Sequence, residues 1–346
     1  MNNQIYDLII IGSGPAGLTA SIYASRYGLN NFVLGKVRGG TISYAHKVDN
    51  YPGLNGLSGM EIMDKIEQHA KSLGGQIIYD PVDNIRRENS IFTITTDSEK
   101  QYWAKAIILA TGTERRKLDV PGEKELQGKG VSYCVTCDAP FYRGKTVALI
   151  GGSDAACSGA VHLAEFASKI YLIYRREHLR AEPFWVKQWE DLETQGKGEA
   201  VFNTNLVEIL SQAHISKTPG LIEVKQEPAK QNQISDVKAE VVGGVKLDKP
   251  YKGSDLLLVD GVFIEIGGVP GTTLVQSLGV FVDESGYIKV NDEMETNVPG
   301  LFAAGDMVDK AKVMSQMITA CAWGAIAAGS AYKYFKGRQA PQQKGS

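Results

Sequence analysis

Two glycine-rich turns, each directly after a short apolar run, constrain the fold of this chain more than any other feature. The first run, Leu8–Ile11, is continuous and apolar, as a buried parallel strand requires, and Gly12-x-Gly14-x-x-Gly17 and a helical pattern follow at once. Small residues at this spacing let backbone N–H groups and the helix N-terminus approach a pyrophosphate. A bare GxGxxG is a weak signal, but strand, turn and helix in register make it strong. We therefore expect a dinucleotide site here, rather than a tight turn without a ligand.

A second turn of the same kind lies in the middle of the chain. The run Thr146–Ile150 leads into Gly151-Gly152-Ser153-Asp154-Ala155-Ala156, and a helical pattern and the strand-like run Ile170–Tyr174 follow. We expect a second dinucleotide to lie against Gly152, Ser153, Asp154 and Ala155.

The residues after the second of these strands indicate which nucleotide is bound. An NAD site has an acid there, whereas this chain has Arg175, Arg176 and Arg180. Guanidinium groups are planar, permanently charged and able to bind a phosphate with two hydrogen bonds, so they favour the 2′-phosphate of NADPH. The alternative is a solvated cluster of surface charge.

Between the two turns lies Cys134-Val135-Thr136-Cys137-Asp138, whose cysteines can close and reopen a small disulfide. At the start of a helix the pKa of one such thiol falls, and the thiolate is the attacking species in disulfide exchange. Asp138 is placed to move a proton to or from the departing sulfur. The sequence therefore predicts a redox-active disulfide framed by two nucleotide sites.

Half of a zinc site is the alternative use of such a cysteine pair. Zinc needs four ligands, and the other two cysteines, Cys157 and Cys321, stand singly in apolar helical runs. We interpret these two as small buried hydrophobic residues and expect no metal.

Composition argues against several other classes of protein. A hydrophobic content of 43% and a charged content of 22% are typical of a soluble globular chain, and 346 residues suffice for two domains. A formal net charge of −2 gives no reason to expect nucleic acid or a membrane surface as partner. The N-terminus lacks the basic flank of a signal peptide, and Met317–Tyr334 is better interpreted as a packed core helix than as a membrane span. We expect a cytoplasmic protein.

Five motifs in order resemble the low-molecular-weight thioredoxin reductases, and the resemblance covers about residues 5–335. They are the first glycine turn with its alanine-rich helix, Asp49-Asn50-Tyr51-Pro52-Gly53 after a Gly-Gly turn, the Cys-x-x-Cys-Asp sequence, Asp260–Gly267, and Thr296–Asp306. The resemblance implies FAD and NADPH as cofactors, a homodimer, and a partner that is thioredoxin or a thioredoxin-like or glutaredoxin-like protein.

The resemblance also implies roles for individual residues. Cys137 lies against the flavin and takes electrons from it, Cys134 attacks the partner's disulfide, and Asp138 is the acid/base. Ile266 faces the nicotinamide nucleotide. The implied FAD contacts are Gly12, Ser13, Gly14, Pro15, Ala16, Gly35, Gly39, Gly40, Thr41, Asn50, Val82, Ala110, Thr111, Gly112, Gly305, Asp306, Gln316 and Met317.

The predicted fold is α/β, with two Rossmann-like, three-layer nucleotide-binding domains, the second inserted into the first. Residues 1–117 and 250–335 form the FAD domain, residues 118–249 carry the NADPH site and the thiols, and residues 336–346 form a disordered tail. A polar excursion at Lys225–Lys238 is expected to be a surface loop or hairpin.

Departures from the family pattern leave the electron donor open. Ser153 stands where the family has glycine, and Ser158 and Gly159 replace two acids. Near the flavin, Thr41 and Ser315 replace a glutamine and an arginine. The alternatives are a flavin disulfide oxidoreductase that takes electrons from ferredoxin, a dithiol oxidase, and a non-catalytic flavin-binding redox sensor.

Overall fold

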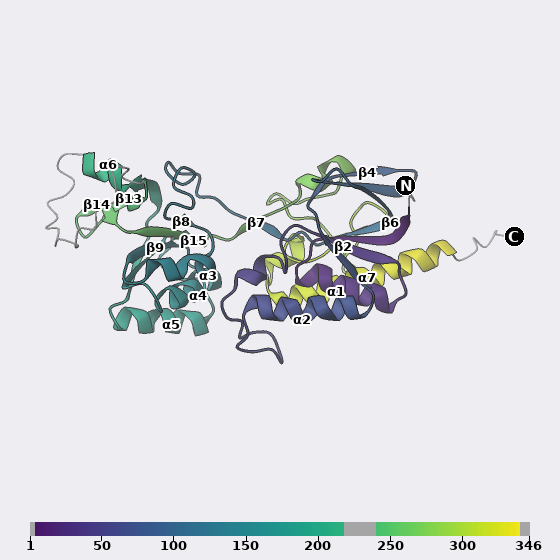
Figure 1. Ribbon diagram of the computed structural model, residues 1–346, viewed down its shortest axis with the longest axis horizontal. Coiled ribbons are helices and arrows are strands. Elements are labelled where there is room, and N and C mark those ends of the chain that lie inside the picture. Colours follow the sequence, from purple (N-terminus) through teal and green to yellow (C-terminus); the bar gives the residue numbers. More distant parts are fainter. Residues whose placement is uncertain (1–3, 218–239, 340–346) are drawn as a thin grey trace, which may run out of the picture. The chain divides into compact units, whose positions relative to one another are not determined.

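The computed structural model describes residues 4–217 and 240–339, so the predicted excursion at Lys225–Lys238 lies outside the described residues. The chain divides into two compact units (Figure 1). Unit 1 comprises Met1–Glu114 and Gly268–Ser346, and unit 2 comprises Arg115–Gly267. One unit thus interrupts the other, in agreement with the predicted fold class.

Unit 1 is built on a seven-stranded sheet of order β3-β2-β1-β6-β5-β4, in which β17 also pairs with β6. The parallel pairings join β1 (Ile5–Ile11), β2 (Asn31–Gly35), β3 (Gln76–Tyr79), β6 (Gln101–Leu109) and β17 (Leu301–Ala303). The antiparallel strands β4 (Val82–Glu88) and β5 (Ile91–Thr96) extend the sheet beyond β6.

Both faces of this sheet are covered. Leu8 and Ile10 of β1 pack in one core with residues of the helices α1 (Pro15–Arg26), α2 (Gly59–Ser72) and α7 (Met317–Gln339), which lie along one face in Figure 1. Ile9 and Ile11 point the other way and pack in a second core with residues of η3 (Thr273–Leu278). Because successive residues of a strand face opposite sides, the continuous apolar run is explained by burial on both faces.

Helix α7 is longer than the sequence suggested. Residues 336–339, predicted as part of a disordered tail, continue the helix, and the rest of that tail lies outside the described residues. Tyr334 and Phe335 pack against the helix-side core and hold the last turns in place. Among the described residues, no helix combines the length and apolarity needed to cross a membrane.

Unit 2 contains a parallel five-stranded sheet of order β11-β10-β9-β15-β8. Its strands are β8 (Val131–Ser132), β9 (Thr146–Ile150), β10 (Lys169–Tyr174), β11 (Gly198–Phe202) and β15 (Gly261–Ile264). Its helices are α3 (Val135–Asp138), α4 (Asp154–Leu163) and α5 (Pro183–Thr194), and the short η2 (Ala139–Tyr142) follows α3. The strands β12 (Leu206–Ser211), β13 (Val242–Tyr251) and β14 (Ser254–Leu258) form a separate antiparallel sheet, and α6 (Gln212–Lys217) follows β12.

The chain crosses between the units at two strands that pair with each other, β7 (Thr113–Arg115) and β16 (Gly268–Pro270). The sequence placed the second crossing at residue 250, earlier than the observed one at residue 268. The difference arises because β13 and β14 form a hairpin and β15 then pairs with β9 and β8, so that all three strands belong to unit 2.

Candidate functional site

The first glycine-rich turn joins β1 to α1 and lies against the end of β6. Gly12 has φ +120°, and a methyl group there would lie 2.0 Å from the carbonyl oxygen of Ala110. A methyl group on Gly17 would lie 1.8 Å from the carbonyl oxygen of Gly12. Only glycine fits at these two positions, so turn, strand and helix approach each other as the dinucleotide motif requires.

The Gly39–Gly40 turn after β2 faces the same turn. A methyl group on Gly40 would lie 2.9 Å from the Cα of Gly14, the residue that precedes α1. Ser43 donates a hydrogen bond of 2.7 Å to the carbonyl of Gly40, and η1 (Thr41–Tyr44) follows. The structure therefore brings the Gly12–Gly17 turn and the Gly39–Gly40 turn together at the N-terminus of α1.

The structure explains why the second strand ends in glycine instead of a ribose-binding acid. A methyl group on Gly35 would lie 2.4 Å from the hydroxyl oxygen of Ser13. That hydroxyl donates to the carbonyl of Val37 at 2.9 Å and so holds the loop after β2. Any side chain at position 35 would displace Ser13, so these two predicted residues act together.

Sequence reasoning missed Glu67, a buried carboxylate of α2. It accepts hydrogen bonds from Lys71 at 2.6 Å, from the hydroxyl of Tyr79 at 2.6 Å and from Arg38 at 3.2 Å. These bonds, led by those from Lys71 and Tyr79, hold its pKa below the ordinary value although burial acts in the opposite direction. Glu67 thus fastens the loop that carries the Gly39–Gly40 turn to α2 and β3. Its Glu-x-x-x-Lys spacing was the only sequence signal.

Asp306, after β17, has a buried carboxylate oxygen without a hydrogen-bond partner among the described residues. Burial raises the pKa of Asp306, and a hydrogen bond from Ser315 acts against that shift. A buried polar atom without a partner costs free energy, so this oxygen is suited to accept a bond from a ligand hydroxyl. The unpartnered oxygen supports the predicted role of Asp306 as a contact of the FAD.

The other predicted flavin contacts lie at the ends of nearby elements of unit 1. The side-chain amide of Asn50 donates to Gln316 at 3.1 Å, directly before α7 begins at Met317. Thr111, after β6, is held by contacts to Met307 and to the carbonyl of Gly271. Gly305 is positioned so that a methyl group there would lie 3.1 Å from the Cβ of Ala16. Val82 begins β4, and Gly112 has φ +67° with open space beside it.

The residues of unit 1 fit a bound FAD. The Gly12–Gly17 turn at the start of α1 offers helix N–H groups for a pyrophosphate. The unpartnered carboxylate oxygen of Asp306 offers an acceptor for a ribityl hydroxyl. The N-terminus of α7, beside Gln316, offers partial positive charge for the pyrimidine edge of a flavin ring.

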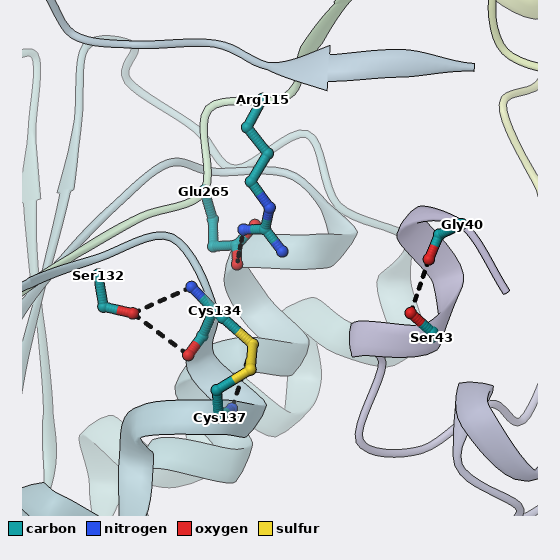
Figure 2. The surroundings of a disulfide bond; sticks show 7 residues. All are labelled: Gly40, Ser43, Arg115, Ser132, Cys134, Cys137 and Glu265. Carbon is teal, nitrogen blue, oxygen red and sulfur yellow. Dashed lines mark hydrogen bonds and ion pairs between the residues drawn. A yellow bond between two sulfur atoms is a disulfide. The ribbon is translucent and has the colours of Figure 1, made fainter. Parts of the chain in front are cut away.

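The two central cysteines form a disulfide with an S–S distance of 2.02 Å, as predicted (Figure 2). Cys134 caps α3, and its sulfur accepts a hydrogen bond of 3.2 Å from the backbone N–H of Cys137. The hydroxyl of Ser132 accepts from the N–H of Cys134 at 3.0 Å and donates to its carbonyl at 3.3 Å (Figure 2). Cys137 is exposed and Cys134 half-buried. An N–H directed at Cys134 stabilises negative charge on this sulfur.

Helix α4 packs against the short helix that carries the cysteine pair. A methyl group on Gly159 would lie 3.1 Å from a methyl of Val135, which stands between the cysteines. A longer side chain at Gly159 would therefore press on the turn that carries the cysteine pair. Asp138 ends α3 and is half-buried.

The remaining cysteines are separately buried. Burial raises the pKa of Cys157 to about 12. Cys321 lies 3.8 Å from the hydroxyl of Tyr51 and 3.8 Å from the carbonyl oxygen of Pro15, and burial raises its pKa too. Neither thiol is suited to the role of a metal-binding thiolate.

The second glycine-rich turn leads from β9 into α4. Gly151 has φ +145°, and a methyl group on Gly152 would lie 2.6 Å from the ring of Tyr174 at the end of β10. Ser153 precedes α4 and makes no side-chain cap bond. Arg175, Arg176 and Arg180 follow β10 with exposed side chains.

Glu265, directly after β15, is a second carboxylate that sequence reasoning missed. Its carbonyl oxygen would lie 2.3 Å from a methyl group on Gly151, so it stands beside the second turn. Its side chain pairs with Arg115 at 3.1 Å (Figure 2). The predicted nucleotide contact Ile266 is the next residue and packs against the β12–β13 side of unit 2.

Comparison with known proteins extends these findings over both units. Residues 6–324 match the family model described as pyridine nucleotide-disulphide oxidoreductase. A thioredoxin reductase of Bacillus subtilis is 36% identical over 333 residues, which cover 96% of this chain and 95% of the relative. One of Listeria innocua is 37% identical, with 96% of this chain and 94% of the relative covered. A crystal structure of Lactococcus lactis thioredoxin reductase superimposes with a TM-score of 0.82 at 32% identity, covering 96% of this chain and 99% of that one.

Proposed function

Because this chain belongs to the pyridine nucleotide-disulphide oxidoreductase family, and within it to the thioredoxin reductases, we propose that it reduces the disulfide of thioredoxin or of a similar small protein. NADPH is the proposed electron donor and FAD the proposed bound cofactor. The observation that carries the proposal is the closed Cys134–Cys137 disulfide, with an N–H donor directed at the sulfur of Cys134.

The reaction at sulfur follows from this arrangement. Reduction of the disulfide takes up two electrons and leaves two thiols. The thiolate of Cys134, stabilised by the N–H of Cys137, attacks the partner's disulfide and forms a mixed disulfide. Cys137 then attacks the sulfur of Cys134, which releases the partner as a dithiol and restores the original bond. Asp138 is the proposed proton donor and acceptor for the sulfurs.

FAD, when bound, supplies the change from hydride chemistry to thiol chemistry that no side chain can perform. The glycine turns around Gly12 and Gly40 would hold its pyrophosphate, Asp306 would accept from one of its hydroxyls, and Asn50 with Gln316 would bind its ring. The remaining predicted FAD contacts also belong to unit 1.

NADPH binds, in this proposal, at the second turn of unit 2. Gly152, Ser153 and Ala155 lie at the N-terminus of α4, where a pyrophosphate is favoured, and the three exposed arginines after β10 suit the 2′-phosphate.

Ser153 favours a second candidate, an enzyme with the same flavin and thiols but another donor. Its hydroxymethyl group stands where a pyrophosphate would need close backbone approach, which suits ferredoxin-dependent reduction or dithiol oxidation.

We also propose that the protein is a homodimer and that it is cytoplasmic. Size-exclusion chromatography tests the dimer.

An anaerobic titration separates the candidates. If the proposal is correct, stoichiometric NADPH bleaches the yellow flavin promptly and thioredoxin disulfide restores the colour. Bleaching by reduced ferredoxin but not by NADPH would establish the second candidate. The variants Cys134→Ser and Cys137→Ser should each lose turnover and keep bound flavin, and undiminished turnover in either would contradict the thiol mechanism.

A further inference from the structure

The segment Arg175–Glu182 after β10, here called the arginine loop, is fastened to its surroundings at both ends. Near its start, the carbonyl of Arg176 accepts a hydrogen bond of 3.1 Å from the N–H of Asn203. Near its end, the N–H of Arg180 donates to the carbonyl of Gly152 at 2.8 Å. One backbone bond therefore joins the loop to the second glycine turn and the other joins it to the segment after β11, and neither depends on a side chain.

One further bond in this region depends on a side chain. The carboxylate of Asp154, the first residue of α4, accepts a hydrogen bond of 2.7 Å from the N–H of Glu182. Glu182 is the last residue of the arginine loop and directly precedes α5. Asp154 thus connects the N-terminus of the helix at the nucleotide turn to the far end of the loop.

The position of Asp154 is unexpected for a phosphate site, because a carboxylate repels an anion. The N-terminus of α4 stabilises this carboxylate, and its bond to Glu182 directs it toward the loop backbone. The sequence suggested Asp154 as a direct nucleotide contact, and in the structure its carboxylate also accepts a bond from the backbone of Glu182.

The three arginines of the arginine loop are not paired with an acid among the described residues. Within the described part of the chain, the guanidinium groups of Arg175, Arg176 and Arg180 take part in no ion pair or hydrogen bond, and all three residues are exposed. Of the loop's two acids, Glu177 lies 3.9 Å from His178, and Glu182 forms no ion pair with a described residue. Three unpaired cations on a loop whose backbone is held by hydrogen bonds suit a phosphate group, because less backbone entropy is lost when an anion binds.

We infer that Asp154 is a positioning residue that holds the arginine loop in the geometry that selects the 2′-phosphate of NADPH over the free hydroxyl of NADH. This inference rests on the proposed use of NADPH. Asp154 acts through the backbone of Glu182, so its removal affects recognition of the phosphate and leaves the contacts that both nucleotides share at Gly152 and Ser153.

Two substitutions at position 154 separate the hydrogen bond from the charge. Asp154→Ala removes both, whereas Asp154→Asn removes the charge and keeps an oxygen acceptor for the N–H of Glu182. If charge were the only effect, both variants would bind the 2′-phosphate more tightly, since a repelling anion is lost. If the inference is correct, Asp154→Ala lowers the NADP⁺ over NAD⁺ binding preference about tenfold, as the loss of one charge-assisted hydrogen bond predicts, and Asp154→Asn retains most of it.

A third variant removes the donor instead of the acceptor. Glu182 has φ −57°, which proline also adopts, so Glu182→Pro deletes the N–H without opposing the backbone at that residue. It should lower the preference as much as Asp154→Ala does, and the double variant should be no worse than either single one, because both break the same bond. This variant also decides the matter if Asp154→Ala fails to fold.

Binding of NADP⁺ and of NAD⁺ to the full-length protein, measured by calorimetry, gives the preference without relying on turnover. Amide hydrogen exchange at Glu182 gives a direct reading of the bond, and exchange should be faster in Asp154→Ala than in the wild type and in Asp154→Asn. An unchanged preference in Asp154→Ala, or equal losses in Ala and Asn variants, would overturn the inference alone. A wild type that does not prefer NADP⁺ would overturn the proposed donor and this inference with it.

Discussion

The carboxylate of Glu265 lies 3.1 Å from the guanidinium of Arg115, in a pair whose side chains are only 16% and 27% exposed. Burial raises the pKa of Glu265 to about 7, and the positive charge of Arg115 acts in the opposite direction without cancelling the effect. Desolvation therefore outweighs the ion pair, and this carboxyl group exchanges its proton near neutral pH.

We expect this group to make stability depend on pH. Because its pKa is higher in the folded protein than its ordinary value of 4.5, the folded state binds more protons than the unfolded state between pH 4.5 and about 7. Its contribution is therefore favourable at the acidic end and is lost as pH rises through about 7, by on the order of 3 kcal/mol in total. In Glu265→Gln this part of the pH dependence should disappear.

Denaturant unfolding at a series of pH values measures the effect. The neighbouring substitution Glu114→Gln is the control, since that side chain is 70% exposed and its pair with Lys36 at 3.6 Å is a surface one. Equal slopes of stability against pH in the wild type and in Glu265→Gln would show that Glu265 is not the titrating group.

The features that sequence reasoning found are local, and those it missed join distant segments. The glycine turns and the cysteine pair lie within a few consecutive residues, so spacing and residue type were enough to predict them. The roles of Glu67 and Glu265 depend on partners such as Tyr79 and Arg115 from other elements, and spacing carries no such information. The second crossing was misplaced for the same reason, since the pairing of β15 with β9 joins segments more than a hundred residues apart.

Position 35 lacks a ribose-binding acid, and only the structure explains why glycine stands there. The sequence shows that the strand ends in Gly35-Lys36 and contains no acid there, but it does not show the cause. The 2.4 Å approach of Ser13 to any side chain at Gly35 explains that absence through packing, which a pattern of residue types does not encode.

Asp306 should matter more for flavin affinity than for the stability of the protein without flavin. Its buried, unpartnered oxygen costs free energy in the absence of a ligand and would gain a partner if FAD binds as proposed. We expect Asp306→Ala to lower FAD affinity roughly tenfold to a hundredfold, with the flavin-free protein no less stable than the wild type. Equilibrium dialysis of the reconstituted protein and thermal unfolding of the flavin-free protein measure the two quantities.

The control for this substitution is Asp292→Ala, which removes a carboxylate with a side chain 96% exposed from the same unit. It should leave FAD affinity unchanged. A loss of stability in flavin-free Asp306→Ala with unaltered flavin affinity would assign the residue a structural role instead.

Two glycines of α7 should respond in opposite directions to the same substitution. A methyl group on Gly324 would lie 2.1 Å from the carbonyl oxygen of Ala16 in α1, whereas one on Gly329 meets nothing closer than 3.7 Å. Gly324→Ala must therefore push the helices apart and should destabilise the protein by about 1–3 kcal/mol, while Gly329→Ala should stabilise it by about 0.5–1 kcal/mol through helix propensity. Because Ala16 lies in the Gly12–Gly17 turn at the proposed pyrophosphate site, Gly324→Ala alone should lose FAD during dialysis. Equal stability of the two variants in urea unfolding would show that α1 and α7 do not require this close approach.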